Sequence, residues 1–345
     1  MSRQFSMGEY IRSYQANLQP AFNFQANTAD EWMQWREQFF PKLLELMGDW
    51  PRERVELQPV ILERTEFDAY TCEKIIIQSE ANMKIPMYML IPRKAAKGNP
   101  AILCLHGHGA GKDDVMGIQH GERQREVDYK ELNYHIAPRL AEDGFVVLVP
   151  DARGFGERSL GYGKPHRHGE KDGCDLVFLK SIMMGFNPLT LNIWDIMRCI
   201  DYLETREEVD PGRIGSAGLS FGGAWSLYAT VFEERIKASA VCGYFNTFES
   251  FAINWGNFCG SMTIPNVLKY GEMADVAALI APRPLLISNG NQDHGFPIEA
   301  SIQAFPTLEK AYQAAGYPDR VKHDVFDGGH EFHYKAVVDW MKQWL

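Results

Sequence analysis

The pattern Gly218-Leu-Ser220-Phe-Gly222 places a serine between two glycines, at the junction of an expected strand and an expected helix. The apolar run 213–217 precedes it, and the helix-length segment 221–232 follows it. Glycines on both sides permit a sharp turn that raises a serine hydroxyl above a sheet. We therefore expect Ser220 to act as a nucleophile, and the backbone amide of Phe221 to donate to an oxyanion.

A serine hydroxyl attacks only when a base removes its proton, so the pattern requires a histidine that is oriented by a carboxylate. On this kind of strand-to-helix turn the chain order is serine, acid, histidine. His330 follows the expected strand 322–326, and Asp293 follows the expected strand 285–288. Because ligands bind at the carboxyl ends of parallel strands, we expect Asp293 and His330 to lie beside Ser220.

Other residues are alternatives for these two roles. The nearby histidines His333 and His323 are alternatives for the base, and the carboxylates Glu249 and Asp327 are alternatives for the acid. A loop histidine without a catalytic role is the alternative interpretation of His330.

A second oxyanion donor should come from the loop after the first parallel strand, which reads His106-Gly-His108-Gly-Ala-Gly111. Its glycines allow the backbone to approach a substrate. We assign the donor to the amide of His108, with the amide of Gly109 as the alternative. The two histidines make a poor metal site, because no third ligand is spaced to join them. The loop also lacks the spacing of phosphate-binding loops, so the sequence implies no metal or organic cofactor.

The elements that must position these residues alternate from residue 100 onward: short apolar runs are separated by helix-length segments. Such alternation is typical of a parallel sheet covered on both faces, which predicts the α/β fold class. Three earlier strand-like runs, separated by short polar turns, indicate an antiparallel entry to the sheet. The expected strands are 55–62, 70–78, 85–91, 101–105, 145–149, 213–217, 238–242, 285–288 and 322–326, and the expected helices are 132–142, 189–205, 221–232, 298–315 and 332–344.

An N-terminal helix is expected over residues 28–47. Thr28 and Glu31 have the spacing of a capping box, and apolar residues then recur at intervals of three and four. We expect this helix to cover the main domain. A contact between copies of the chain, which would make a homo-oligomer, and a wall of the ligand site are the alternatives.

Five motifs together resemble the α/β-hydrolase superfamily: His106-Gly-His-Gly109, Pro150-Asp-Ala-Arg-Gly-Phe-Gly156, Gly218-Leu-Ser-Phe-Gly-Gly223, Gly290-Asn-Gln-Asp293 and Gly329-His330. Within it, the chain is most similar to the dienelactone-hydrolase-like branch that includes bacterial acetyl xylan esterase-like proteins. The resemblance implies a mostly parallel, doubly wound sheet and a serine esterase. It implies Ser220 as nucleophile, Asp293 as acid and His330 as base, with His108 and Phe221 as oxyanion donors. Dienelactone hydrolases carry a cysteine where this chain has Ser220, so the serine favours ordinary ester hydrolysis.

The expected domain organisation is a helical N-terminal extension, 1–54, followed by an α/β-hydrolase catalytic domain, 55–345. Two lid-like inserts are expected in the second part. The first, 157–188, has no clear periodicity. The second, 244–282, is rich in aromatic residues, which would either line an acyl or sugar pocket or form the core of a small helical insert.

Charged residues near the expected site fall into two groups. Asp151 and Arg153 are expected to brace their loop by ion pairing rather than to contact a substrate. The basic loop 158–171 either binds an anionic or sugar substrate or is simply solvated. Its basic residues are Arg158, Lys164, His166, Arg167, His168 and Lys171.

The chain has 345 residues and a formal net charge of −10. An acidic chain lacks the basic footprint of a nucleic-acid binder, and no apolar run is long enough to span a membrane. The N-terminus has no apolar segment of the kind that marks a secretory signal. The six cysteines are scattered singly, which favours free thiols in a reducing compartment. We therefore expect a cytoplasmic protein that acts on a small molecule, without nucleic-acid or membrane partners.

The function expected from these residues is hydrolysis of carboxylic esters through an acyl-enzyme intermediate, with short-chain or acetylated carbohydrate esters as candidate substrates. A serine peptidase or amidase of the same fold is one alternative. Related peptidases usually carry a large N-terminal propeller, which residues 1–54 are too few to form. A ligand-binding homologue without turnover is the other alternative, and the apparently complete set of serine, acid and histidine argues against it.

Overall fold

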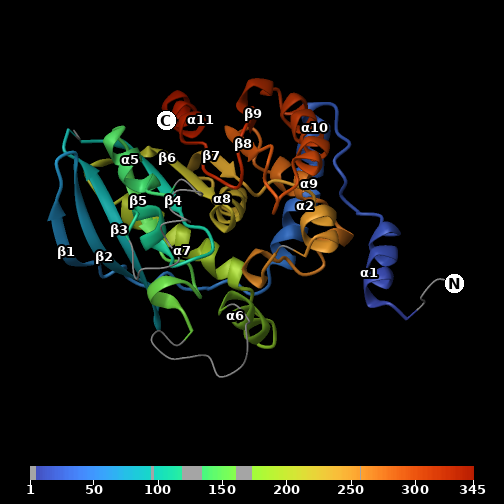
Figure 1. Cartoon of the computed structure of the whole chain (residues 1–345), viewed down its shortest axis with the longest axis horizontal. Helices are drawn as coiled ribbons and strands as arrows, with labels where there is room; N and C mark the ends of the chain where they lie inside the picture. Colours follow the sequence, from blue (N-terminus) through green and yellow to red (C-terminus); the bar gives the residue numbers. More distant parts are fainter. Residues whose placement is uncertain (1–4, 95–96, 119–133, 161–172, 257) are drawn as a thin grey trace.

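The computed structural model describes residues 5–94, 97–118, 134–160, 173–256 and 258–345 (Figure 1). Across these ranges the centre is a nine-stranded sheet in the order β1-β2-β3-β5-β4-β6-β7-β8-β9. The pairs β1–β2, β2–β3 and β3–β5 are antiparallel, and the remaining pairs are parallel. The predicted α/β class, with antiparallel N-terminal strands, is therefore confirmed. The strands are β1 (Val60–Glu66), β2 (Tyr70–Glu80), β3 (Met83–Pro92), β4 (Asn99–Leu105), β5 (Val146–Pro150), β6 (Val209–Leu219), β7 (Ile236–Cys242), β8 (Leu285–Gly290) and β9 (Val321–Phe326).

Helices cover both faces of this sheet (Figure 1). They are α1 (Met7–Ala16), α2 (Ala29–Leu46), α3 (Lys112–Met116), α5 (Ile136–Glu142), α6 (Gly173–Ile182), α7 (Pro188–Leu203), α8 (Phe221–Phe232), α9 (Met273–Ala278), α10 (Ile298–Ala314) and α11 (Tyr334–Trp344). Apolar side chains of α7, α8, α9 and α10 share one core with the sheet, and those of α3, α5 and α11 share the other. In the part of the chain that the structure describes, no helix is long and apolar enough to cross a membrane.

The helix α2 begins at the predicted capping box. The Thr28 side chain accepts from the Glu31 amide, and the Glu31 carboxylate accepts from the Thr28 amide. Phe39 and Leu43 are fully buried in the core that also contains α7 and α8. The helix therefore covers the main domain, whereas α1 buries no residue and lies at the edge of the molecule (Figure 1).

The first strand lies further along the chain than the predicted range 55–62. Every residue of β1 is exposed, so its position is set by hydrogen bonding to β2 and not by a buried apolar face. Leu57, inside the predicted strand, packs against the core, and its carbonyl accepts from the Gln78 amide. The helix α6, within the insert 157–188, is also absent from the sequence prediction.

Buried charges tie the loop after β5 to α7. The fully buried carboxylate of Asp195 accepts from Arg153 Nε at 2.9 Å and lies 2.7 Å from Arg158 Nη1. Burial alone would raise the pKa of Asp195, but Arg158 and Arg153 hold it below its ordinary value, so the group is charged. The Arg158 side chain is thus buried against Asp195, so at this position neither the substrate-binding nor the solvated interpretation of the basic loop applies. The other basic residues of that loop lie outside the described residues.

A second buried ion pair ties the loop after β4 to the loop after β5. Lys112 Nζ lies 3.0 Å from Asp151 Oδ2 and 2.9 Å from Glu157 Oε1, and the Lys112 amide donates to Asp151 Oδ1 at 2.7 Å. Asp151 and Arg153 therefore brace their loop by ion pairing, as the sequence predicts.

Replacing Asp195 by Ala should leave Arg153 and Arg158 without their shared carboxylate. Because removing one partner leaves buried charge uncompensated, we expect the free energy of unfolding to fall by about 3–5 kcal/mol. Urea unfolding followed by circular dichroism measures this loss. The matched control is Lys97→Ala, which breaks an exposed pair with Glu207 and should cost about 0–1 kcal/mol. Equal losses in the two variants would contradict the structural role of Asp195.

Candidate active site

Ser220 lies at the turn between β6 and α8, with φ of 63° and ψ of −121°, a conformation that residues with side chains rarely adopt. Two close backbone approaches require glycine beside it. A Cβ atom at Gly218 would clash with the Gly222 carbonyl, and one at Gly222 would clash with the Leu105 carbonyl. The Ser220 amide donates to the Cys242 carbonyl at 2.9 Å, which ties the turn to β7. Tight backbone packing against β4 and β7 thus determines where Ser220 lies.

His330 and Asp293 lie on the loops that follow β9 and β8. Nδ1 of His330 is 2.6 Å from Oδ2 of Asp293, whose side chain is fully buried. The other carboxylate oxygen, Oδ1, accepts from the amides of Gly295 and Phe296 at 2.8 and 3.0 Å. The Phe296 ring stacks on the His330 ring with centroids 5.5 Å apart. These contacts hold His330 with Nδ1 turned toward the acid.

Ser220 and His330 line one cavity of about 510 Å³. The residues that complete its described lining come from four separate segments: His108, Asp175, Gly256, Phe258, Cys259, Met262, Gly295 and Phe296. The structure therefore brings together Ser220, His330 and His108 at the carboxyl edge of the sheet, with Asp293 behind His330. Within this described lining Asp175 supplies a carboxylate, and no lysine or arginine is present.

The predicted oxyanion donors lie in the two segments that flank Ser220. Phe221 is fully buried as the first residue of α8. On the other side, a Cβ atom at Gly107 would lie 3.5 Å from the Ser220 Cβ, so the loop after β4 packs directly against the serine. The next residue along this loop is His108, and Gly109 follows it.

His106 has a structural position. Its side chain is buried, Nε2 accepts from the Ala152 amide at 3.0 Å, and Nδ1 lies 2.7 Å from the Gly107 carbonyl, to which it donates in the tautomer that these partners require. Burial lowers the pKa of His106, which favours the neutral ring. His106 thus links the loop after β4 to the loop after β5.

His108 points elsewhere, toward two thiols. Its Nε2 lies 3.1 Å from Cys259 Sγ and 3.7 Å from Cys174 Sγ. Hydrogen bonding from the Cys259 thiol and from His108 lowers the pKa of Cys174 to about 6. All six cysteines are buried and none forms a disulfide. Sequence reasoning missed this cluster, since no spacing pattern relates the three positions.

The alternative bases and acids lie outside the cavity that Ser220 lines: His333, His323, Glu249 and Asp327. Nδ1 of His333 is 2.7 Å from Asp324 Oδ2. Nε2 of His323 is 3.1 Å from the Ser301 hydroxyl, and burial lowers the pKa of His323 to about 4. Among these candidates, His330 is therefore the histidine that shares a cavity with Ser220.

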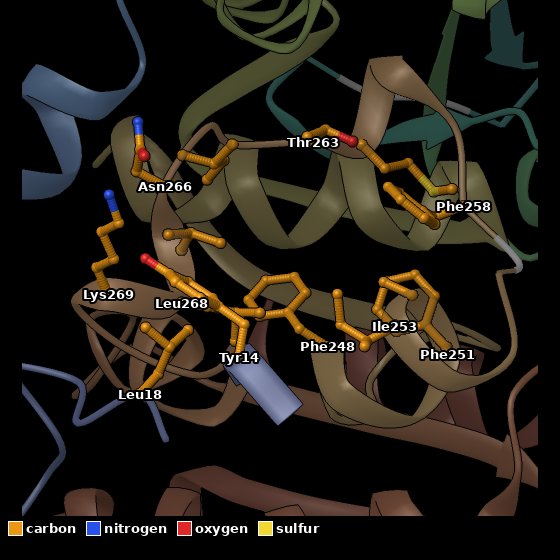
Figure 2. Close-up of a pocket in the computed structure, with 14 residues that line it drawn as sticks. Tyr14, Leu18, Phe248, Phe251, Ile253, Phe258, Thr263, Asn266, Leu268 and Lys269 are labelled. Atoms are coloured by element: carbon orange, nitrogen blue, oxygen red, sulfur yellow. The ribbon is translucent and has the colours of Figure 1, made fainter. Parts of the chain in front are cut away.

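A second hollow, of about 260 Å³, adjoins the first. It is lined by Tyr14, by Leu18 and by mostly apolar side chains from the segments 248–253 and 258–269. Figure 2 shows Phe258 and Lys269 at its opposite ends. Phe258 and Met262 line both cavities, so the aromatic insert contributes pocket walls. It also contributes buried core residues: Tyr244, Phe245, Phe248 and Phe251.

The sheet order, the turn at Ser220 and the loops that carry Asp293 and His330 define an α/β-hydrolase fold. The chain belongs to the Abhydrolase family, whose model matches residues 2–239. The model of the Prolyl oligopeptidase family matches residues 190–345. The resemblance to the α/β-hydrolase superfamily is thereby confirmed.

Known proteins resemble the chain over nearly its whole length. It is 25% identical over 315 residues to the putative hydrolase YtaP of Bacillus subtilis (strain 168), covering 88% of this chain and 98% of that protein. The structure of a putative acetyl xylan esterase from Bacteroides fragilis NCTC 9343 has a TM-score of 0.77 at 21% identity, covering 94% of this chain and 82% of that one. A glucuronoyl esterase from Solibacter usitatus has a TM-score of 0.65 at 17% identity, covering 95% of this chain and 99% of that one. These structures share the fold.

The half-buried position of His323 gives a pH prediction. Its pKa of about 4 in the folded chain lies below the ordinary histidine value of about 6.5, so between these pH values the unfolded chain binds more protons. The free energy of unfolding should therefore fall as the pH drops from 6.5 toward 4, and His323→Gln should make this fall shallower. Urea unfolding at several pH values measures how steeply the free energy of unfolding changes with pH in the two proteins. A ring titration of His323 near pH 6.5, followed by NMR, would contradict the prediction.

Proposed function

We propose that the protein is a serine hydrolase that cleaves carboxylic esters. The observation that carries the proposal is the 2.6 Å contact of His330 Nδ1 with the buried Asp293, in a cavity that His330 shares with Ser220. In this mechanism Ser220 Oγ attacks the ester carbonyl while His330 takes its proton, and Asp293 stabilises the imidazolium. The amides of Phe221 and His108 donate to the oxyanion.

The second half of the reaction uses the same groups. His330 returns the proton to the leaving alcohol, and the acyl group stays on Ser220. Water then enters and gives a proton to His330 as it attacks the acyl carbonyl. His330 returns this proton to Ser220 Oγ as the acid leaves, which restores the serine.

We infer that the substrate is a carbohydrate ester with a small acyl group. The similar structures are named as an acetyl xylan esterase and a glucuronoyl esterase, which supports a sugar ester. Phe258, with 45% of its surface exposed, offers an aromatic face at the cavity on which a sugar ring can stack. The carboxylate of Asp175 in the lining favours a neutral acetyl ester over a substrate with a free carboxylate.

A serine peptidase or amidase is the second candidate, favoured by the match of residues 190–345 to the Prolyl oligopeptidase family. The two candidates share the same nucleophile and base, so they differ in leaving group. Turnover of acetylated sugars faster than peptide amides supports the esterase, and the reverse order supports the peptidase.

Ser220→Ala should lower kcat for a short-chain nitrophenyl ester by about 10⁴–10⁶-fold, because the acyl-enzyme can no longer form. Labelling by a fluorophosphonate probe should be lost as well. The matched control is Ser250→Ala, which alters a half-buried serine outside the cavity. This variant should keep both the ester hydrolysis and the labelling by the probe. Hydrolysis that survives Ser220→Ala would refute the nucleophile. A wild-type chain that neither hydrolyses the ester nor reacts with the probe would refute the proposal that the protein is a serine hydrolase.

Asp293→Asn should lower kcat by about 10³–10⁴-fold with a small change in KM, because the amide no longer favours the tautomer that His330 needs. Steady-state kinetics on the same ester measure the effect. The comparison is Asp327→Asn, which alters an exposed carboxylate that accepts from Gln292 and should leave kcat unchanged. If Asp327→Asn is the more damaging change, the acid has been assigned wrongly.

A further inference from the structure

Three side chains that can bind a metal ion meet at the edge of the catalytic cavity. His108 is on the loop after β4, Cys174 is in the first turn of α6, and Cys259 precedes the short turn Gly260–Met262. Their ligand atoms all lie within 4.8 Å of one another, with His108 Nε2 3.1 Å from one sulfur and 3.7 Å from the other. Both thiols are buried, with 1% and 6% of their residues exposed.

These separations are close to those that a tetrahedral ion imposes. Zinc binds cysteine sulfur at about 2.3 Å and histidine nitrogen at about 2.0–2.1 Å. Tetrahedral angles then place nitrogen and sulfur about 3.5 Å apart and two sulfurs about 3.8 Å apart. The observed nitrogen–sulfur distances, 3.1 and 3.7 Å, lie on either side of the nitrogen–sulfur separation of about 3.5 Å. Small side-chain movements would therefore suffice to bind an ion.

The backbone around the cluster holds the two cysteines in place. Asp175, next to Cys174, accepts from the Gly260 amide at 2.8 Å, and Gly260 is next to Cys259. A Cβ atom at Gly260 would clash with the Phe178 side chain, so glycine is what lets this segment lie against α6. The contacts of the neighbouring residues Asp175, Phe178 and Gly260 therefore bring the two thiols together, and they do not depend on contact between the thiols.

We propose that His108 Nε2 and the sulfur atoms of Cys174 and Cys259 bind one Zn²⁺. On binding, both thiols lose their protons to solvent and the histidine remains neutral. His108 and Cys259 also line the catalytic cavity, so the fourth coordination position faces that cavity and takes water or a substrate oxygen.

The bound ion joins three segments that are distant in the sequence: the loop after β4, α6 and the segment around Cys259. Because the loop after β4 also carries the His108 amide, the ion fixes the backbone that donates to the oxyanion. That consequence for turnover rests on the proposed function. The binding itself does not, and it can be measured without substrate.

The test uses the full-length chain, reduced and freed of metal, and titrated with Co²⁺ under nitrogen. Tetrahedral thiolate ligation gives visible d–d bands and a near-ultraviolet sulfur-to-cobalt band. We expect one Co²⁺ per chain, displaced by Zn²⁺. Cys174→Ser and Cys259→Ser should each weaken binding by more than about 100-fold, since loss of an outer-shell partner alone costs 10–100-fold. The matched control, Cys72→Ser, alters another buried thiol on β2 and should bind as the wild type does.

A second measurement needs no variant. The X-ray absorption spectrum of the zinc-loaded wild type should show two sulfur neighbours at about 2.3 Å and one imidazole nitrogen at about 2.0–2.1 Å. Absence of thiolate bands, or bands that persist when both cysteines are replaced, would overturn the proposal. So would zinc bound without sulfur ligands. Because Ser220→Ala should bind the metal normally, failure of this proposal and failure of the hydrolase proposal are distinguishable.

Discussion

A backbone turn in which two positions leave no room for a side chain determines where Ser220 lies. Gly218 and Gly222 pack against each other and against the Leu105 carbonyl, while Ser220 takes a positive φ that costs of order 1–3 kcal/mol for a residue with a side chain. Hydrogen bonds from the Ser220 amide to β7 and from the Ala224 amide to the Ser220 carbonyl hold this conformation. Because β6 lies between β4 and β7, Ser220 lies between the loops that follow these two neighbouring strands.

Buried polar contacts help to hold the loops after β4 and β5. Lys112 with Asp151 and Arg153 with Asp195 are buried pairs, and His106 bridges two loops through a neutral ring. In a low-dielectric interior each such group depends on its partner, so these loops have few alternative arrangements. By contrast, the segment 248–269 packs through apolar and aromatic side chains, which interact without strict directionality.

Local patterns were sufficient for the elements that carry the site. The α8 range 221–232 agrees with the structure because a continuous apolar run follows the glycine turn, and the capping box at Thr28 marks the start of α2. The strand β1 could not be predicted, since an exposed edge strand has no buried face to produce a pattern. The geometry brings Ser220, Asp293 and His330 together, and their roles remain predictions. The cluster at His108 could not be predicted, because only the fold brings residues 108, 174 and 259 together.

Phe258 and Met262 form the boundary between two cavities, and they lie in an insert that contains none of Ser220, Asp293 and His330. These two cavity-lining residues are therefore separate in the sequence from the strand ends that hold Ser220, Asp293 and His330. In laboratory evolution, libraries confined to positions 258 and 262 would merge, enlarge or seal the two cavities while the glycine turn and the paired loops keep their geometry. The shape of both cavities thus depends on two side chains that lie outside the turn at Ser220 and the loops that carry Asp293 and His330.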